Sequence, residues 1–316
     1  MAKPIKTVQT VVTAVDEPAR GVKRLVLADP DDWELPPFRP GAHIDLHLAK
    51  GLVRTYSLCN EPTDNRRYEI AVKCEADGRG GSRFVHEELR VGTALGVSLP
   101  RGGLKTHDQA LNVFIAGGIG VTPFVSAIRD LREKGRTNYV LHWASSGHPV
   151  LPGMVADAFA DGHVHLYNTA IEPRPSLAAI LKQYGDEAGA FCCGPTSMLD
   201  AFDAATASWP AERKHVERFT PPAFARDDNA APYTLVLAQS KKEIVVRPEI
   251  GLVGALEELE ADVSVSCAGG ICGSCRTRWL EGPPIHNDSV LSPMQRQHEV
   301  MVCVAGCAGP RLVLDI

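Results

Sequence analysis

The run SCAGGICGSC at residues 266–275 holds three cysteines, Cys267, Cys272 and Cys275, and Cys303 follows in the run MVCVAG. The spacing C-x4-C-x2-C…C is typical of a plant-type [2Fe–2S] cluster, in which four thiolates hold two irons. A zinc site more often spaces its ligands as two C-x2-C pairs. The intervening glycines allow a tight loop that turns backbone N–H groups toward the sulfurs. The pattern therefore predicts an electron carrier.

The composition is that of an ordinary globular protein. The length of 316 residues predicts two or three domains, and 44% apolar and 22% charged residues are usual values. No stretch approaches the roughly 20 apolar residues of a membrane span, and residues 1–10 lack the apolar core of a signal peptide. The nine cysteines are an odd number, and four of them have cluster spacing. We therefore expect a reducing, cytoplasmic location, and neither a membrane nor a nucleic acid as partner.

The formal net charge of −5 belongs to the cluster-bearing part of the chain. From Asp227 onward there are 12 acidic and seven basic residues, while the preceding 226 residues balance. Such an excess either steers this part toward a basic partner surface or is simply a solvated face. Arg276 and Arg278 lie beside the cluster loop and leave both interpretations open.

The first hundred residues alternate short apolar runs with turns, which predicts an antiparallel barrel or sandwich. The expected strands cover residues 7–15, 21–29, 43–48, 54–60 and 68–73. A short helix is expected after the glycines near residue 80. We place this domain at 1–104.

The middle segment changes to an α/β pattern. Residues 111–116, LNVFIA, form a continuous apolar run typical of a buried parallel strand, and the helical spacing that follows ends at Gly135. The runs YVLHWA and AFCCG predict further core strands, with a helix over SLAAILKQY between them. This pattern predicts a doubly wound nucleotide-binding domain over 105–224.

Residues 220–232 are rich in Pro, Ala and charge and predict a linker, which we place at 225–232. Beyond it, a hairpin (YTLVLA, KEIVVR), a helix (LVGALEEL), the cluster loop and a final strand (RLVLDI) are expected. We place a small ferredoxin domain at 233–316, which the cluster would help to hold together.

Two motifs in the barrel segment suit a phosphate and a flat ring. The run R-T-Y-S at residues 54–57 offers a forked cation, an aromatic face and a small hydroxyl donor at the end of a strand. The run G-R-G-G-S at residues 78–82 opens a helix whose free N–H groups can bind a phosphate. Each motif alone is also compatible with a routine strand or a glycine-rich turn.

Two further motifs lie at strand ends of the α/β segment. The run AGGIGVTP at residues 116–123 is a strand–turn–helix junction suited to a pyrophosphate, although it is not the G-x-G-x-x-G fingerprint. The run CCGP at residues 192–195 closes a later strand, at the carboxyl edge where open α/β sheets bind ligands. Cys193 has the alternative role of a structural core thiol, the common fate of a free cysteine.

In this order, R-T-Y-S, G-R-G-G-S, G-G-I-G-V-T-P and C-G-P resemble the signatures of the ferredoxin–NADP reductase superfamily. With the cluster motif near the C-terminus, the whole chain resembles the phthalate dioxygenase reductase family, which includes the vanillate demethylase reductases. The resemblance implies a multidomain fold: an antiparallel β-barrel flavin domain, an α/β doubly wound nucleotide-binding domain and an α+β, β-grasp plant-type ferredoxin domain.

The resemblance also implies roles for individual residues. The residues expected to contact the flavin phosphate and ring are Arg54, Thr55, Tyr56, Ser57, Arg79, Gly81 and Ser82. The residues expected to contact the dinucleotide are Gly117, Gly118, Gly120, Thr122, Cys193 and Gly194. Phe219 matches the aromatic residue that covers the flavin, its alternative role being an apolar anchor before the linker. Ser57, Cys193 and Phe219 are expected beside the reacting rings.

The resemblance alone favours FMN over FAD, because the sequence does not exclude an adenine-binding insertion. NADH is favoured over NADPH because no Lys or Arg lies between Arg136 and Arg174, where a 2′-phosphate would normally need one. This stretch includes the run HWASSGHP at residues 142–149, where the adenosine end is expected, and His148 is taken as the local candidate cation there.

The fourth cluster ligand is a choice between Cys303 and Cys307. Cys303 follows Cys275 after 27 residues, which matches the family pattern, and it lies in a predicted strand over residues 300–305. We therefore expect the ligands Cys267, Cys272, Cys275 and Cys303, with Cys307 as a spare thiol.

The activity implied by the resemblance is that of an NADH-dependent oxidoreductase. A hydride passes from NADH to FMN, and single electrons then pass through the [2Fe–2S] cluster to the Rieske centre of a separate aromatic-ring oxygenase or O-demethylase. A monomer that docks transiently fits such a shuttle. The alternatives are a reductase for another acceptor, such as a haem monooxygenase or a non-aromatic Rieske oxygenase, and a non-enzymatic redox sensor.

Overall fold

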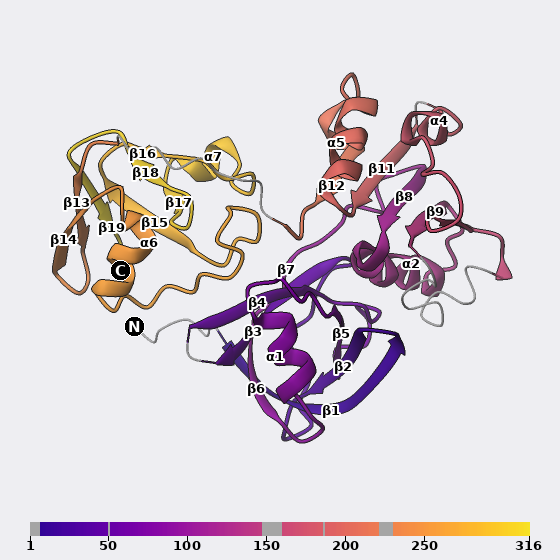
Figure 1. The fold of residues 1–316 in the computed structure, drawn as a ribbon, viewed down its shortest axis with the longest axis horizontal. Helices are drawn as coiled ribbons and strands as arrows, with labels where there is room; N and C mark the ends of the chain where they lie inside the picture. The colour runs from indigo at the N-terminus through magenta and orange to yellow at the C-terminus, as the bar shows by residue number, and fades with distance from the viewer. Residues whose placement is uncertain (1–6, 50, 147–159, 186, 221–229) are drawn as a thin grey trace. The chain divides into compact units, whose positions relative to one another are not determined.

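The computed structural model describes residues 7–49, 51–146, 160–185, 187–220 and 230–316. The chain divides into two compact units, Met1–Phe219 and Thr220–Ile316, and each is described by itself (Figure 1). The predicted linker at 225–232 and the predicted boundary at 224 fall largely on residues 221–229, outside the described residues. Within the described ranges, no helix is long and apolar enough to cross a membrane.

Antiparallel strands and one helix form the first part of the first unit (Figure 1). These elements are β1 (Thr7–Ala19), β2 (Val22–Ala28), β3 (Ala42–Ala49), β4 (Leu52–Ser57), β5 (Tyr68–Lys73), α1 (Gly81–Glu88), β6 (Ala94–Ser98) and β7 (Arg101–Gly102). The strand order is β4-β3-β6-β1-β2-β5, with β7 paired to β3. A bridge between Leu58 and Ile70 joins the end of β4 to β5 and closes the sheet. The predicted antiparallel barrel is confirmed.

A parallel sheet forms the second part of the first unit. Its elements are β8 (Leu111–Gly117), η1 (Gly118–Val121), α2 (Thr122–Glu133), β9 (Tyr139–Ser145), β10 (Val164–Asn168), α4 (Leu177–Leu181), β11 (Ala188–Cys193), α5 (Thr196–Ala205), η3 (Ala211–Arg213) and β12 (Lys214–Glu217). The order β10-β9-β8-β11-β12 puts the first strand in the middle. The chain therefore changes direction across the sheet between β8 and β11, the point at which doubly wound sheets bind ligands.

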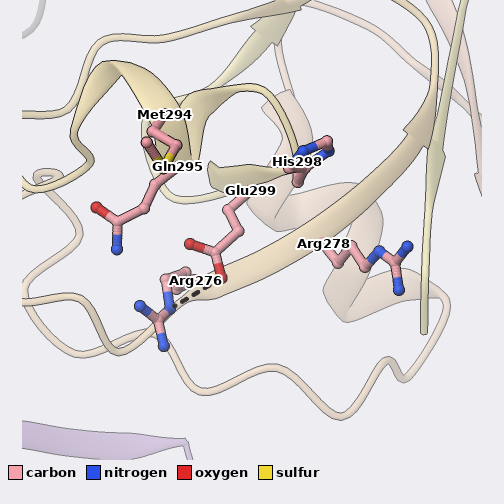
Figure 2. Close-up of a pocket in the computed structure, with 6 residues that line it drawn as sticks. All are labelled: Arg276, Arg278, Met294, Gln295, His298 and Glu299. Carbon is pink, nitrogen blue, oxygen red and sulfur yellow. Dashed lines mark ion pairs between the residues drawn. The ribbon is translucent and has the colours of Figure 1, made fainter.

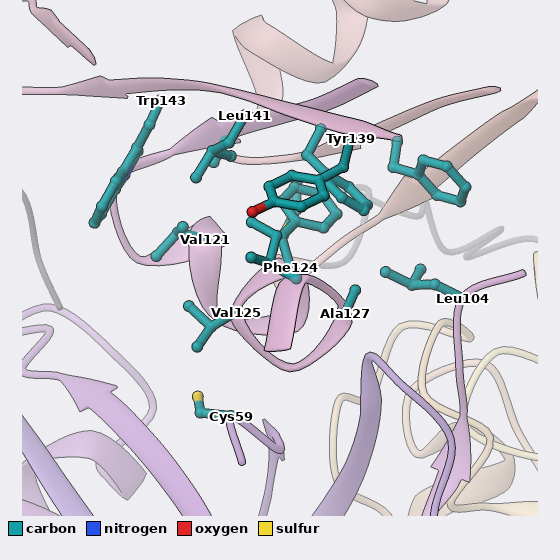
Figure 3. Close-up of a cluster of buried hydrophobic side chains, with 14 of the residues drawn as sticks. Cys59, Leu104, Val121, Phe124, Val125, Ala127, Tyr139, Leu141 and Trp143 are labelled. Atoms are coloured by element: carbon teal, nitrogen blue, oxygen red, sulfur yellow. The ribbon is translucent and has the colours of Figure 1, made fainter. Parts of the chain in front are cut away.

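One apolar core joins the barrel to the parallel sheet. Phe124 on α2 stacks on Phe114 of β8, with ring centroids 5.0 Å apart. The same cluster of buried side chains includes Cys59 and Leu104 from the barrel part (Figure 3). Because the two parts share this core, the end of β4 and the turn after β8 belong to one body. The predicted boundary between 104 and 105 lies inside this unit, between β7 and β8.

A buried carboxylate adds a polar link between the same two parts. Glu69 of β5 is 4% exposed and pairs with Arg67 at 2.9 Å and with Arg129 of α2 at 3.5 Å. The Arg129 guanidinium also donates to the carbonyl of Cys59 at 3.2 Å. A buried charge must be compensated in this way, so the pairing favours one arrangement of α2 on the barrel.

The second unit is a mixed sheet with a helix packed on it. Its elements are β13 (Tyr233–Leu237), β14 (Lys242–Val246), α6 (Gly251–Glu258), β15 (Arg276–Glu281), β16 (Pro284–Ile285), α7 (Pro293–Arg296), β17 (Glu299–Met301), β18 (Gly306–Cys307) and β19 (Arg311–Leu314). The main order is β14-β13-β19-β15-β17, and β16 pairs with β18. Because β13 and β14 form a hairpin and β13 runs parallel to β19, the predicted β-grasp domain is confirmed.

Cys303 does not lie in a strand, so the strand predicted over residues 300–305 is wrong. β17 ends at Met301, and the N–H groups of Val304 and Ala305 both donate to the Met301 carbonyl at 3.1 Å. Apolar residues continue past the strand, but the backbone turns back on itself there. The turn directs the Cys303 sulfur toward the loop, where it accepts a hydrogen bond from the Gly270 N–H at 3.3 Å.

Candidate functional site

A candidate anion site lies where β4 meets the N-terminus of α1. The Arg54 guanidinium donates to the carbonyls of Val53 and Arg79. Burial, and then the neighbouring Arg79 charge, lower the pKa of Arg54. A Cβ at Gly81 would lie 2.3 Å from Arg54 Cγ, so glycine there leaves room for the arginine beside the helix start. Two cations and a helix N-terminus without an acidic first turn fit a phosphate.

The hydroxyl groups of Thr55 and Ser82, both expected to contact the flavin, form hydrogen bonds within the protein. Thr55 Oγ1 donates to Asp45 at 2.7 Å, and Arg101 pairs with the same carboxylate at 2.8 Å. The Ser82 hydroxyl accepts from the Glu75 N–H at 3.1 Å and so fixes the loop before α1. These contacts hold β4 and the loop before α1 in place, and the candidate anion site lies between them.

Tyr56 and Ser57 complete the strand end. Burial raises the pKa of Tyr56 to about 12, which keeps the phenol neutral at physiological pH. Ser57 is 9% exposed and is the last residue of β4, opposite His43 of β3. The strand thus presents a neutral aromatic ring and a small hydroxyl beside the two arginines, a set that suits a flavin.

The two α/β motifs meet at the carboxyl edge of the parallel sheet. A Cβ at Gly120 would lie 2.3 Å from the Cys193 carbonyl oxygen, and one at Gly117 would lie 3.1 Å from Gly194 Cα. No side chain fits between these backbones, so both glycines are required by close approach. Runs separated by about seventy residues in the sequence therefore form one surface at the switch point between β8 and β11.

Hydrogen bonds from two neighbouring side chains fix the conformation of the glycine turn after β8. Gly118 has φ +53°, with open space where a Cβ would point. The Trp143 indole donates to the Gly118 carbonyl at 3.0 Å, and the Thr122 hydroxyl donates to Ile119 at 3.1 Å. The glycine turn is therefore preorganised, as a pyrophosphate site requires.

Cys193 and Phe219 lie at the same edge of the sheet but differ in exposure. Cys193 is fully buried, and its burial raises the pKa of the thiol well above its usual range, so it stays neutral. It pairs in register with Glu217, the last residue of β12, and Phe219 follows two residues later with 42% of its surface exposed. An exposed aromatic ring beside the nucleotide edge is available to stack on a ligand. His148 lies outside the described residues.

The cluster loop brings three cysteines together in the second unit. Cys267, Cys272 and Cys275 are each less than a tenth exposed. Two observations show that position 270 needs a glycine: its φ is +67°, and a Cβ there would lie 2.8 Å from Val304 Cγ2. The Gly269 N–H donates to the Cys267 sulfur at 3.4 Å.

Cys303 joins these three thiols from the turn after β17. A hydrogen bond with the Cys267 thiol raises the pKa of Cys272 above its usual range, and burial is the second largest cause of that rise. Cys303 hydrogen-bonds to both Cys267 and Cys275; the first contact lowers its pKa, but the second, with burial, raises it to about 12 overall. Four sulfurs this close cannot all ionise without cations between them. The donor set and the N–H groups aimed at sulfur fit an iron–sulfur cluster.

Cys307 has other partners. Its thiol donates to the Arg311 carbonyl of β19 at 3.2 Å and accepts from the Gly309 N–H at 3.4 Å, in the turn between β18 and β19. Among the described residues, no three His, Cys, Asp or Glu side chains form a site for one metal ion. The predicted cluster instead divides its four thiolates between two irons.

Ser274 is a further contact to the cluster thiols that the sequence analysis did not single out. Its hydroxyl lies 3.0 Å from the Cys272 sulfur. With Cys272 ionised, the hydroxyl must be the donor, because a thiolate has no proton to give. The signal in the sequence was a hydroxyl residue inside C-x2-C, next to Gly273.

Comparisons with known proteins agree with this geometry. The family model of the 2Fe-2S iron-sulfur cluster binding domain matches residues 235–307. Tetrachlorobenzoquinone reductase of Sphingobium chlorophenolicum is 37% identical over all of both chains. Phthalate dioxygenase reductase of Burkholderia cepacia is 30% identical over 96% of each chain. A solved phthalate dioxygenase reductase, described as a modular structure for electron transfer from pyridine nucleotides to [2Fe-2S], matches 98% of each chain with a TM-score of 0.72 and 29% identity.

Fold, sites and relatives together define a reductase that carries electrons from a pyridine nucleotide through a flavin to an iron–sulfur cluster. The chain belongs to the phthalate dioxygenase reductase family. Membership confirms the predicted fold class, the oxidoreductase activity and the predicted cofactors: pyridine nucleotide, flavin and [2Fe–2S] cluster.

Replacing Ser274 with alanine is expected to lower the reduction potential of the cluster by some tens of millivolts. A hydrogen bond to a charged group contributes roughly 1.5 kcal/mol, and 1.4 kcal/mol corresponds to about 59 mV for one electron. A redox titration followed by electron paramagnetic resonance measures the shift. Ser289→Ala, which removes an exposed hydroxyl near the same loop, is the matched control. An unchanged potential in Ser274→Ala would show that this hydroxyl does not donate to the cluster.

Proposed function

We propose that this protein is an NADH-dependent reductase component that passes electrons to the Rieske centre of a separate oxygenase. The observation that carries the proposal is the presence of a phosphate site, a dinucleotide edge and four converging thiols in one chain. A flavin held at the phosphate site would supply the conversion between a two-electron donor and a cluster that takes one electron at a time. A redox sensor would not need all three sites.

The flavin we propose is FMN, with its phosphate between Arg54, Arg79 and the first N–H groups of α1. The support is the paired guanidiniums and the space left by Gly81. Ser57 and Tyr56 then contact the ring from the strand end, while Thr55 and Ser82 hold the surrounding loops. Such a site binds and orients the flavin without supplying an acid or base.

The dinucleotide we propose is NADH, bound across the edge formed by Gly117, Gly118, Gly120 and Gly194, with Thr122 bracing the turn. The absence of Lys and Arg from residues 137–173 supports NADH over NADPH. Neutral, buried Cys193 and exposed Phe219 would flank the nicotinamide and the flavin. Their part is to position the rings and exclude water, which sets the near-contact distance on which hydride transfer depends.

For the cluster we propose the ligands Cys267, Cys272, Cys275 and Cys303. The contacts among their thiols support this set. Cys303→Ser is expected to abolish or grossly perturb the cluster, because serine replaces a thiolate ligand with a much poorer one. Cys307→Ser is the matched control and should keep a normal cluster. Iron and sulfide content and the visible spectrum measure both; a normal Cys303→Ser spectrum with a lost Cys307→Ser cluster would reverse the assignment.

The proposed acceptor follows from the names of the relatives. Phthalate dioxygenase reductase is named for an oxygenase partner, whereas tetrachlorobenzoquinone reductase is named for a quinone. A quinone reductase is therefore a second candidate, at 37% identity. A monomeric shuttle that docks transiently in the cytoplasm suits an oxygenase reductase, because weak contacts allow repeated electron delivery.

The acceptor is tested with the purified holoprotein, NADH and either a purified aromatic-ring Rieske oxygenase or tetrachlorobenzoquinone. We expect NADH-dependent reduction of the Rieske centre, with kcat/KM for NADH at least about tenfold above that for NADPH, a difference of roughly 1.4 kcal/mol. Fast quinone reduction that persists in Cys303→Ser would favour the quinone reductase. No turnover with either acceptor, in protein that carries both cofactors, would favour a sensor.

A further inference from the structure

An open groove of about 350 Å³ lies on the surface of the second unit (Figure 2). Its lining comes from β15, α7 and the approach to β17: Arg276, Arg278, Met294, Gln295, His298 and Glu299. Arg276 and Arg278 alternate with buried Thr277 along β15, so both guanidiniums lie on the exposed face of that strand.

The groove is continuous with the backbone that carries two cluster thiols. Arg276 directly follows Cys275, and it pairs across to Met301, two residues before Cys303. The Val302 N–H donates to the Cys275 carbonyl at 3.5 Å. A protein seated in the groove therefore lies against the strands that end at the cluster, where single electrons leave the chain.

The loop beneath α7 is tied to the cluster loop. Arg296 of α7 donates to the Asp288 carbonyl at 2.6 Å, and the Ser289 N–H donates to the Gly270 carbonyl at 3.1 Å. α7 itself begins with a capping box at Ser292 and Gln295. Met294 is thus presented by a short, well-fixed helix rather than by a free loop, although 76% of it is exposed.

The acidic excess of this part of the chain lies away from the groove. Among the described residues, 230–262 hold six carboxylates and three cations, whereas 263–316 hold four of each. One of those four carboxylates, Asp288, is buried and accepts from the Val290 and Leu291 N–H groups. The acidic stretch includes β14 and α6, and β14 is at the opposite edge of the sheet from β17. Cations therefore balance carboxylates in the part of the unit that carries the groove, whereas carboxylates outnumber cations two to one in the part that includes β14 and α6.

The two groove arginines are held loosely. Arg276 lies 3.6 Å from Glu299 and Arg278 lies 3.8 Å from Asp315, and both guanidinium-bearing side chains are at least half exposed. Exposed ion pairs of this length contribute little to stability, so exchange with a partner's carboxylates costs little. Arginine and methionine are enriched at protein interfaces, the one for forked carboxylate contacts and the other for adaptable apolar contacts.

We propose that this groove is the docking surface for the protein that takes electrons from the cluster, and that the contacting face of that protein carries carboxylates around an apolar spot that receives Met294. The proposal rests on the proposed function, because it requires a protein as one-electron acceptor. It replaces the basic partner that the overall charge of this segment had suggested, because two arginines line the groove and the described excess of carboxylates belongs to residues 230–262, which include β14 at the far edge of the sheet.

The test uses the full-length holoprotein and two probe acceptors of opposite charge, cytochrome b5, which is acidic around its haem edge, and cytochrome c, which is basic there. The variant Arg276→Glu/Arg278→Glu reverses the groove. The control Lys241→Glu/Arg247→Glu makes the same charge change at the β14–α6 side, where both residues are exposed. Redox titration of each variant corrects the rates for any change in cluster potential.

We expect the groove variant to reduce cytochrome b5 at least about tenfold more slowly at low ionic strength and to reduce cytochrome c faster, with the difference from wild type vanishing at high salt. The control should leave the ratio of the two rates unchanged. Met294→Ala should slow cytochrome b5 reduction a few-fold without changing its salt dependence. Equal effects of the groove and control variants on the ratio would overturn the proposal.

A separate measurement distinguishes a failure of this proposal from a failure of the proposed function. NADH-driven bleaching of the cluster, followed by stopped flow without any acceptor, should be the same in the groove variant and the wild type. Slower bleaching in the variant would mean that the groove serves electron entry from the flavin, which also overturns the proposal. Failure of NADH to bleach the cluster in the wild type would instead contradict the proposed function.

Discussion

The apolar core shared by α2 and the barrel is the constraint on which the proposed chemistry depends. Hydride transfer requires two rings in near contact, so the flavin site and the dinucleotide site must belong to one rigid body. Phe124 and Val125 of α2 pack in the same cluster as Cys59, two residues beyond the Ser57 strand end (Figure 3). Arg129, one helical turn further along, ties α2 to buried Glu69. Packing and one compensated charge thus position both sites at once.

The cluster unit has a different constraint, the close approach of three loop thiols and a fourth from the turn after β17. Positive φ at Ala268, Gly270 and Gly273 lets the backbone wrap closely and aim its N–H groups at sulfur. The turn after β17 then brings in Cys303. Because thiolates at this distance repel one another, iron binding and folding of the loop are expected to be coupled. This unit has its own core, built on α6 and β19, so the two constraints are satisfied independently.

The sequence was sufficient for the features that depend on local pattern. The cysteine spacing predicted the cluster domain, short apolar runs separated by turns predicted the barrel, and the apolar run before Gly117 predicted the parallel sheet. It was insufficient where tertiary pairing decides. Nothing local marks Asp45 as the partner of Thr55, or Glu69 as the partner of Arg129, because those partners meet only in the folded sheet. Cys303 was expected in a strand, because the run of apolar residues continues past the point where the chain turns.

The central claim is that one chain converts a hydride into single electrons. It is tested most directly by adding NADH anaerobically to protein shown to hold both cofactors, while recording the flavin and cluster bands of the visible spectrum. Both bands are expected to bleach, with the flavin band responding first. Bleaching of neither band, or of the flavin alone with the cluster remaining oxidised, would contradict it.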